Sequence, residues 1–155
     1  MLQDPETLRR LNKAKRYLRL FLRDTPELNR LIRKEESDDE MLTFALDMAI
    51  DDWNTTTPVI GFRTIANFPS LYLLMHGAVI QVLKSQGLYQ ARNELTYNSG
   101  GSSFVRSNKS QYYQSWLINF AGEYELKKRN LKIQQNISAA YGGVSSEYDT
   151  IGYSW

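Results

Sequence analysis

The stretch NKSQYYQSWLINFAGEYELKKRNLKIQQNISAAY, residues 108–141, says more about the architecture of this chain than any other. It contains no proline and only one glycine, Gly122, so little in it interrupts a helix. A helix of these residues, at ~1.5 Å per residue, would be about 50 Å long. A compact domain of this chain length has a diameter of only about 40 Å. We therefore expect part of the helix to extend beyond its own core and to contact another subunit.

Apolar residues follow two faces of this predicted helix. The first stripe is Tyr113, Leu117, Phe120, Tyr124 and Leu131, and the second is Leu126, Ile133, Ile137 and Ala140. Positions 124 and 126 differ by about 200° around a helix, so the two stripes face nearly opposite ways. The first stripe predicts packing within a bundle. The second stripe, with Arg129 beside it, predicts a contact between subunits. A bend or break near Asn130 is the alternative.

Helix-start signals upstream predict further helices. Asp4 with Pro5 is an N-cap followed by a first-turn proline, and Ser37 with Glu40 forms a capping box. The predicted helices cover residues 4–23, 25–32, 37–53 and 70–97. Residues 71–83 are mostly apolar, which places that helix at the centre. Residues 54–68 predict an ordered loop, with a short strand pair as an option, and residues 98–107 predict a second loop.

The fold class that follows is all-α, a bundle of four to five helices with a long C-terminal helix and an extended C-terminal arm. The chain divides into a basic N-terminal helical segment at residues 1–36, a helical bundle core at residues 37–141 and a docking arm at residues 142–155. The start of the chain lacks the apolar run of a secretory signal, and the most apolar stretch is too short to span a bilayer. We expect no contact with a membrane.

Charge is segregated along the chain, although the net charge is only +2. Residues 1–36 hold ten basic and six acidic side chains, whereas residues 37–60 hold six acidic side chains and no basic one. Such blocks favour register between neighbouring copies. Asp47 and Asp51 lie four residues apart, on one helical face, and are predicted to contact a neighbouring subunit; a solvated acidic face is the other interpretation.

The basic helix over residues 4–23 has a second interpretation. Its residues Arg9, Lys13, Arg16 and Arg23 are candidates for contact with nucleic acid or with an acidic partner. Acidic residues flank the run, and no helix-turn-helix connection with a glycine follows it, so specific reading of DNA bases is disfavoured. Loose contact with a DNA backbone or with an acidic neighbour fits better.

The sequence offers little for catalysis. The chain has no cysteine, its single histidine is His76, and it contains none of the common phosphate-binding, dinucleotide-binding or zinc-protease motifs. His76 is predicted to be a packed, hydrogen-bonded core residue. Asp47 and Asp51 alone offer too few oxygen ligands for a cation. We therefore predict no catalytic, cofactor-binding or metal-binding residues; an enzyme using Asp47, Asp51 and His76 is the third hypothesis.

The last fourteen residues, GGVSSEYDTIGYSW, combine two glycines with several large apolar side chains. These side chains are Val144, Tyr148, Ile151, Tyr153 and Trp155. Disordered tails are usually poor in aromatic residues, and the end of this segment alternates apolar and small residues. The pattern favours an extended strand that adds to the edge of a partner's sheet.

Several segments resemble the head-to-tail connector proteins of tailed bacteriophages, also called neck or adaptor proteins. They are LYQARNELTYNSGG at 88–101, KKRNLKIQQNI at 127–137 and the ending AYGGVSSEYDTIG at 140–152. The similarity spans about residues 38–152. It implies a helical subunit that forms a ring, commonly of twelve copies, beneath the portal. It also implies that residues 144–155 dock on the portal protein.

The leading hypothesis is a non-enzymatic structural protein of a phage virion, located at the head-tail junction after assembly in the host cytoplasm. Its expected partners are its own copies, the portal protein, the next neck or tail protein and, without specificity, the passing DNA. The alternative is a small helical nucleic-acid-binding regulator that uses the basic N-terminal helix.

Overall fold

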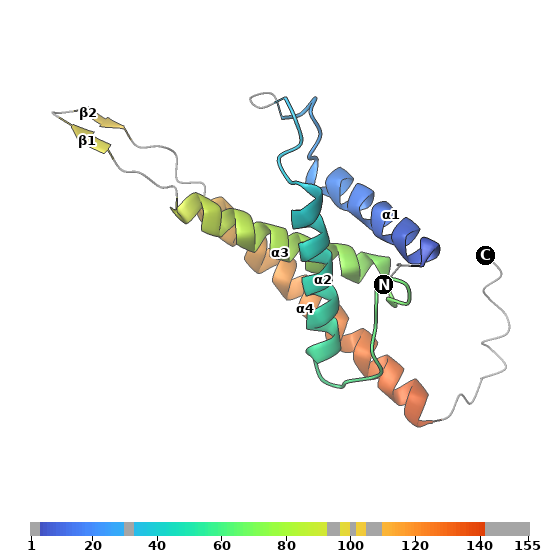
Figure 1. Ribbon diagram of the computed structural model, residues 1–155. Helices are drawn as coiled ribbons and strands as arrows, with labels where there is room; N and C mark the ends of the chain where they lie inside the picture. The colour runs from blue at the N-terminus through green and yellow to red at the C-terminus, as the bar shows by residue number, and fades with distance from the viewer. Residues whose placement is uncertain (1–3, 30–32, 93–96, 100–101, 105–109, 142–155) are drawn as a thin grey trace.

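The computed structural model describes residues 4–29, 33–92, 97–99, 102–104 and 110–141, and its architecture is all-α (Figure 1). The helices are α1 (Pro5–Leu22), α2 (Asp39–Thr55), α3 (Leu71–Arg92) and α4 (Ser110–Ala140). Two short antiparallel strands, β1 (Tyr97–Ser99) and β2 (Ser102–Phe104), lie between α3 and α4 in the chain. None of the helices within these ranges is long and apolar enough to cross a membrane.

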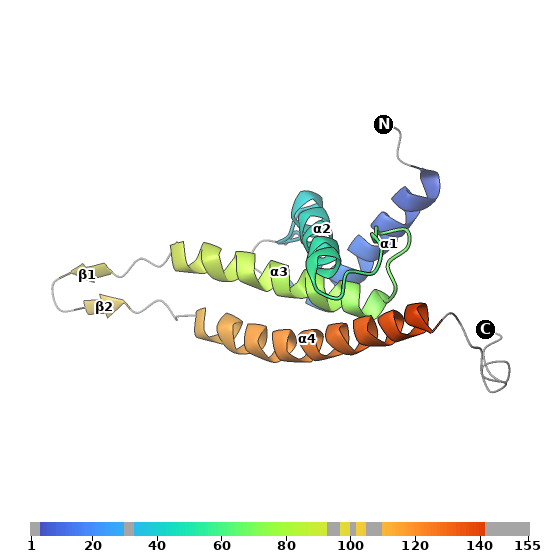
Figure 2. The same cartoon turned by 90° about the horizontal axis from the view of Figure 1, so that it is seen from below.

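Helix α3 is the central element, as its apolar sequence predicts. It packs against α1, α2 and α4. Helices α3 and α4 run side by side in opposite directions, with α1 and α2 on the other side of α3 (Figure 2). A Cβ atom on Gly77 of α3 would lie 2.9 Å from Cβ of Ala49 and 3.2 Å from the hydroxyl oxygen of Tyr124. The glycine therefore lets α2 and α4 approach α3 closely at one level of the bundle.

The buried side chains form two adjoining clusters. The larger cluster joins α1, α2 and α3, and its members include Ala14, Leu18, Leu42, Leu46, Val79 and Val82. The smaller cluster joins α2, α3 and α4 through Trp53, Leu73, Ile80 and Tyr124. Because Ala14 and Leu18 are almost fully buried, α1 is a packed part of the bundle.

The start of α2 differs by one residue from the predicted capping box. The cap is Asp38, whose side chain accepts a hydrogen bond from the backbone N–H of Met41 at 2.7 Å. The N–H of Ser37 instead donates to the buried carboxylate of Asp24 at 2.8 Å. The prediction of Ser37 as the cap was wrong. Asp24 binds the turn that precedes the helix. Asp38, one position after Ser37, caps the helix instead.

Other boundaries also differ from the predictions. The described part of the expected helix over residues 25–32 forms only a turn at 26–28. Helix α3 ends at Arg92, five residues earlier than expected. The strand pair lies at 97–104 rather than in the predicted loop at 54–68, where α2 continues to Thr55 and residues 56–68 contain turns and bends without a strand. The two glycines between β1 and β2 are a hairpin signal. The sequence pattern predicted a loop there and no strands.

Helix α4 continues unbroken through Asn130, so the alternative of a break there is wrong. It has 31 residues against 22 in α3, a difference of nine. Its last turns extend past the start of α3 (Figure 2), and residues 136–141 are all exposed. The expected overhang is therefore at the C-terminal end of α4.

Candidate functional site

Helix α4 has two apolar faces, and only one of them is covered. Tyr124 is buried in the smaller cluster, where Leu117, Phe120 and Leu131 pack against it. On the other side of the helix, Leu126, Ile133 and Ile137 have exposed fractions of 62%, 40% and 52%. The helical spacing makes this face continuous over several turns. The exposed fractions show that no part of the described chain covers it.

The exposed face of α4 extends further than the sequence pattern suggested. Ile118 lies two turns before Leu126 on the same side and is 64% exposed. Gly122 lies between them, and a Cβ atom added to it would meet nothing within 4 Å. Arg129 lies on this face and is exposed. We call Ile118, Leu126, Arg129, Ile133 and Ile137 the outer face of α4.

The predicted inter-subunit residues lie on two separate elements. Leu126, Arg129, Ile133 and Ile137 belong to α4, whereas Asp47 and Asp51 lie on α2, on the other side of α3. Asp47 and Asp51 are both exposed, and neither carboxylate pairs with a cation within the described ranges. Partial burial raises the pKa of the Asp47 carboxyl. An unpaired, partly desolvated carboxylate gains from a cation supplied by a partner.

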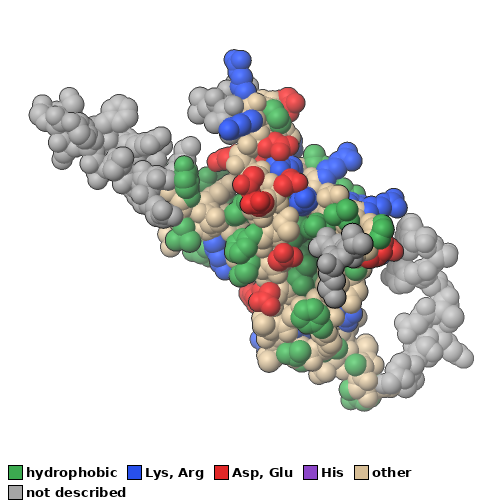
Figure 3. All heavy atoms as spheres, in the orientation of Figure 1, with side chains coloured by type: hydrophobic (Ala, Val, Ile, Leu, Met, Phe, Trp, Pro, Cys, Tyr) green, Lys and Arg blue, Asp and Glu red, His purple; other side chains and the backbone are tan. Residues whose placement is uncertain are grey.

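Apolar side chains accompany these carboxylates on α2. Phe44 and Met48 are 54% and 39% exposed, and Glu40 lies one turn before Phe44. Steps of three and four residues bring them to one side of the helix. In Figure 3 acidic side chains gather along α2, with hydrophobic ones among them. We call Glu40, Phe44, Asp47, Met48 and Asp51 the acidic face of α2.

Part of the basic N-terminal helix is used within the subunit. Lys15 and Arg19 each pair with Asp39 at 2.8 Å, and Arg19 also pairs with Glu35 at 2.9 Å. Complementarity between the charge blocks is thus partly intramolecular. The four predicted contact residues, Arg9, Lys13, Arg16 and Arg23, make none of these pairs and are exposed.

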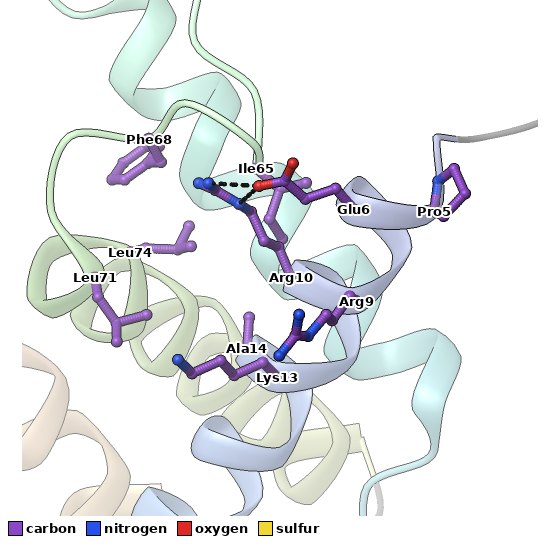
Figure 4. Close-up of a pocket in the computed structure, with 10 residues that line it drawn as sticks. All are labelled: Pro5, Glu6, Arg9, Arg10, Lys13, Ala14, Ile65, Phe68, Leu71 and Leu74. Carbon is purple, nitrogen blue, oxygen red and sulfur yellow. Dashed lines mark hydrogen bonds and ion pairs between the residues drawn. The ribbon is translucent and has the colours of Figure 1, made fainter.

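A cavity of about 680 Å³ lies between α1, the 65–68 turn and the start of α3 (Figure 4). Its lining is Pro5, Glu6, Arg9, Arg10, Lys13, Ala14, Ile65, Phe68, Leu71 and Leu74. Arg10 is occupied, since it pairs with Glu6 at 2.9 Å and donates to the carbonyl of Ala66. Arg9 and Lys13 lie beside each other at the edge of the cavity (Figure 4). We call this cavity the basic groove.

Two buried lysines on α4 were missed by the sequence analysis. Lys128 and Lys132 are each only 2% exposed. Nζ of Lys128 contacts carboxylate oxygens of Asp52 at 2.8 Å and of Glu125 at 2.7 Å. Lys132 donates to the carbonyls of Thr56 and Pro58. Burial lowers the pKa of Lys132, and the neighbouring Lys128 adds to the shift.

The lysines extend a polar cluster that includes Tyr124. Its hydroxyl donates to Asp52 at 2.7 Å, and burial together with this carboxylate raises the pKa of Tyr124 strongly. The sequence does contain a signal for the burial of Lys128. This residue lies four positions after Tyr124 and therefore falls in the core stripe of α4. The cluster connects α4 to the end of α2.

His76 is packed as predicted but is not fully hydrogen-bonded. Its ring lies 4.0 Å from the ring of Tyr72 and 5.6 Å from that of Phe120, measured between centroids. Its Nδ1 is buried without a hydrogen-bond partner, so that part of the prediction was wrong. Burial lowers the pKa of the imidazole. The charged groups that shift its pKa are Glu123 and Lys127 of α4, not Asp47 or Asp51.

The remaining predictions concern metal binding and the C-terminal arm. Within the described ranges, no three histidine, cysteine or acidic side chains gather as metal ligands. The predicted portal-binding residues Val144, Tyr148, Ile151, Tyr153 and Trp155 lie outside the described residues. No protein-family model matches the chain, and neither does a curated protein or a solved structure.

Proposed function

We propose that this protein is a structural subunit of the head-to-tail connector of a tailed phage. It assembles into a ring, docks on the portal protein through residues 144–155 and continues the DNA channel towards the tail. The observation that carries the proposal is the outer face of α4, an uncovered apolar surface on the longest helix. An apolar surface of this kind gains free energy when a second subunit covers it.

Three further features support a structural role. The resemblance to connector proteins includes residues 127–137, which contribute to the outer face of α4. The one histidine lies among aromatic rings, and the buried lysines are held by carboxylates and carbonyls. The exposed carboxylates of Asp47 and Asp51 have no cationic partner within the described ranges, which favours a contact with another subunit. A place at the head-tail junction of a virion is part of the same proposal.

The test is the mass of the full chain in solution, alone and mixed with the portal protein encoded in the same genome. We expect a closed assembly of many copies, of which twelve is the expected number, in the presence of portal rings. Native mass spectrometry and electron microscopy of the mixture measure the copy number and locate the ring. A chain that stays monomeric and leaves portal rings bare contradicts the proposal.

The second candidate is a helical nucleic-acid-binding regulator. The observation in its favour is that Arg9, Lys13 and Arg16 share one exposed side of α1. Binding of duplex DNA measured at low and high salt separates the two functions. A steep salt dependence that disappears on charge reversal of these residues, together with no assembly on portal rings, favours the regulator.

A further inference from the structure

The basic groove has a cationic edge and an apolar wall, which bind different kinds of side chain. Its edge carries Arg9 and Lys13, neither of which has an ion pair within the described part of the chain. Its opposite wall is apolar and includes Phe68, Leu71 and Leu74. Figure 4 shows Lys13 reaching across towards Leu71. An occupant that satisfies both surfaces carries carboxylates next to large apolar side chains.

The acidic face of α2 has this composition. It carries Asp47 and Asp51 without cationic partners, next to the exposed side chains of Phe44 and Met48. The spacing also matches: Asp47 and Asp51 are four residues apart on one helix, as are Arg9 and Lys13, which is about 6 Å along the axis in both cases. An amphipathic helix that places its apolar side chains in a groove is a common mode of recognition.

Nucleic acid fits the groove less well. A phosphate backbone would pair with Arg9 and Lys13 but would leave the apolar wall uncovered. A second copy of the chain offers both the charges and the apolar side chains. The acidic side chains of α2 and the basic side chains of α1 lie on the same face of the molecule (Figure 3). Two copies related by a twofold axis can therefore form two equivalent contacts, in each of which α2 of one copy meets α1 of the other.

We infer that the acidic face of α2 in one copy docks in the basic groove of a second copy. Phe44 and Met48 of the first copy pack against the apolar wall of the groove. Asp47 and Asp51 pair with Arg9 and Lys13 of the second copy. This pairing goes beyond the proposed ring, because it requires neither the portal protein nor the outer face of α4.

Charge reversal in the full chain tests the pairing. Lys13→Glu and Asp47→Lys should each weaken self-association at least tenfold, because each places like charges opposite one another. A one-to-one mixture of the two variants should restore association, since the reversed residues then meet each other. Lys84→Glu is the matched control, because it makes the same charge change on an exposed lysine outside the groove. Lys84 lies about 15 Å along α3 from Leu74, which lines the groove. This variant should leave association unchanged. Analytical ultracentrifugation provides the dissociation constants.

Cross-linking gives a second measurement that does not depend on ring formation. The chain contains no cysteine, so the introduced cysteines are the only thiols that can form a disulfide. A mixture of Lys13→Cys and Asp47→Cys chains should form a disulfide-linked pair, whereas Lys84→Cys with Asp47→Cys should not. Charge reversals without effect, or a failure of the mixture to restore association, overturn the inference even if rings form on the portal. Binding of a DNA oligonucleotide that Lys13→Glu abolishes, with self-association intact, assigns the groove to nucleic acid and also overturns it.

Discussion

Lys128 shows how one buried charge can connect two helices. A lysine is rarely this buried unless its charge is compensated. Here Asp52 of α2 and Glu125 of α4 supply carboxylates, and the Tyr124 ring lies 4.8 Å from the ammonium nitrogen. The two carboxylates differ in environment, because the side chain of Asp52 is 38% exposed and that of Glu125 is 60% exposed. The contribution of Asp52 to stability should therefore be the larger one.

Removing the charge of Asp52 tests this difference. We expect Asp52→Asn to lower the free energy of unfolding by about 1–3 kcal/mol, less than for a fully buried partner because Asp52 is partly solvated. Glu125→Gln removes the other carboxylate of the same lysine and should cost less than about 0.5 kcal/mol. Urea denaturation of both variants measures the two losses. Equal losses would show that the two carboxylates contribute equally and would contradict the larger role of Asp52.

The burial of Lys128 was only partly predictable. Its position four residues after Tyr124 is visible in the sequence and places it in the core stripe. The sequence alone does not show that Asp52, 76 residues earlier, reaches the same point. A charged run such as residues 127–129 is normally interpreted as solvated. Only the packing of α2 on α3 and α4 shows that one member of the run is internal.

At the scale of helices, Gly77 sets how closely α2 and α4 approach α3. Alanine has the higher helix propensity by about 1 kcal/mol, but its Cβ at Gly77 would lie 2.9 Å from Cβ of Ala49. Overpacking of this kind costs about 1–3 kcal/mol. We therefore expect Gly77→Ala to lower the free energy of unfolding, whereas Gly122→Ala, which meets no atom within 4 Å, should raise it by up to about 1 kcal/mol. Thermal and urea unfolding measure both.

This pair of substitutions is informative because both glycines lie inside helices. Propensity alone predicts that both variants gain stability. If Gly77→Ala also gains, α2 and α4 can move apart without loss, and close approach at this level is not needed.

Element existence was easier to predict than element boundaries. Periodicity and the scarcity of glycine predicted α4 to within two residues, because these signals act within the helix. The cap of α2 was misplaced by one residue because Asp24, 13 residues before Ser37, binds the N–H of Ser37. The β1–β2 pair was missed because three-residue strands leave too short a pattern for alternation.

At the scale of the whole molecule, α4 lies on one side of α3, and α1 and α2 lie on the other (Figure 2). One predicted surface, formed by Leu126, Arg129, Ile133 and Ile137, is gathered on a single helix. The other combines Asp47 and Asp51 with Phe44 and Met48, two apolar residues that are exposed on the same helix. Their exposure depends on how α2 is rotated on α3, and apolar spacing in one helix does not determine that rotation.

A substitution at the centre of the outer face of α4 tests assembly separately from folding. Ile133→Glu places a charge on the exposed apolar surface and should prevent ring formation on portal rings, because an unpaired carboxylate at a subunit contact is costly to desolvate. Folding should be unaffected to within about 0.5 kcal/mol, since Ile133 is already 40% exposed. Gln134→Glu introduces the same side chain one position along, about 100° around the helix, and should assemble as the unmodified chain does. Rings formed equally well by both variants would show that subunits meet through another surface, whereas loss of folding in Ile133→Glu would show that this face is covered within one subunit.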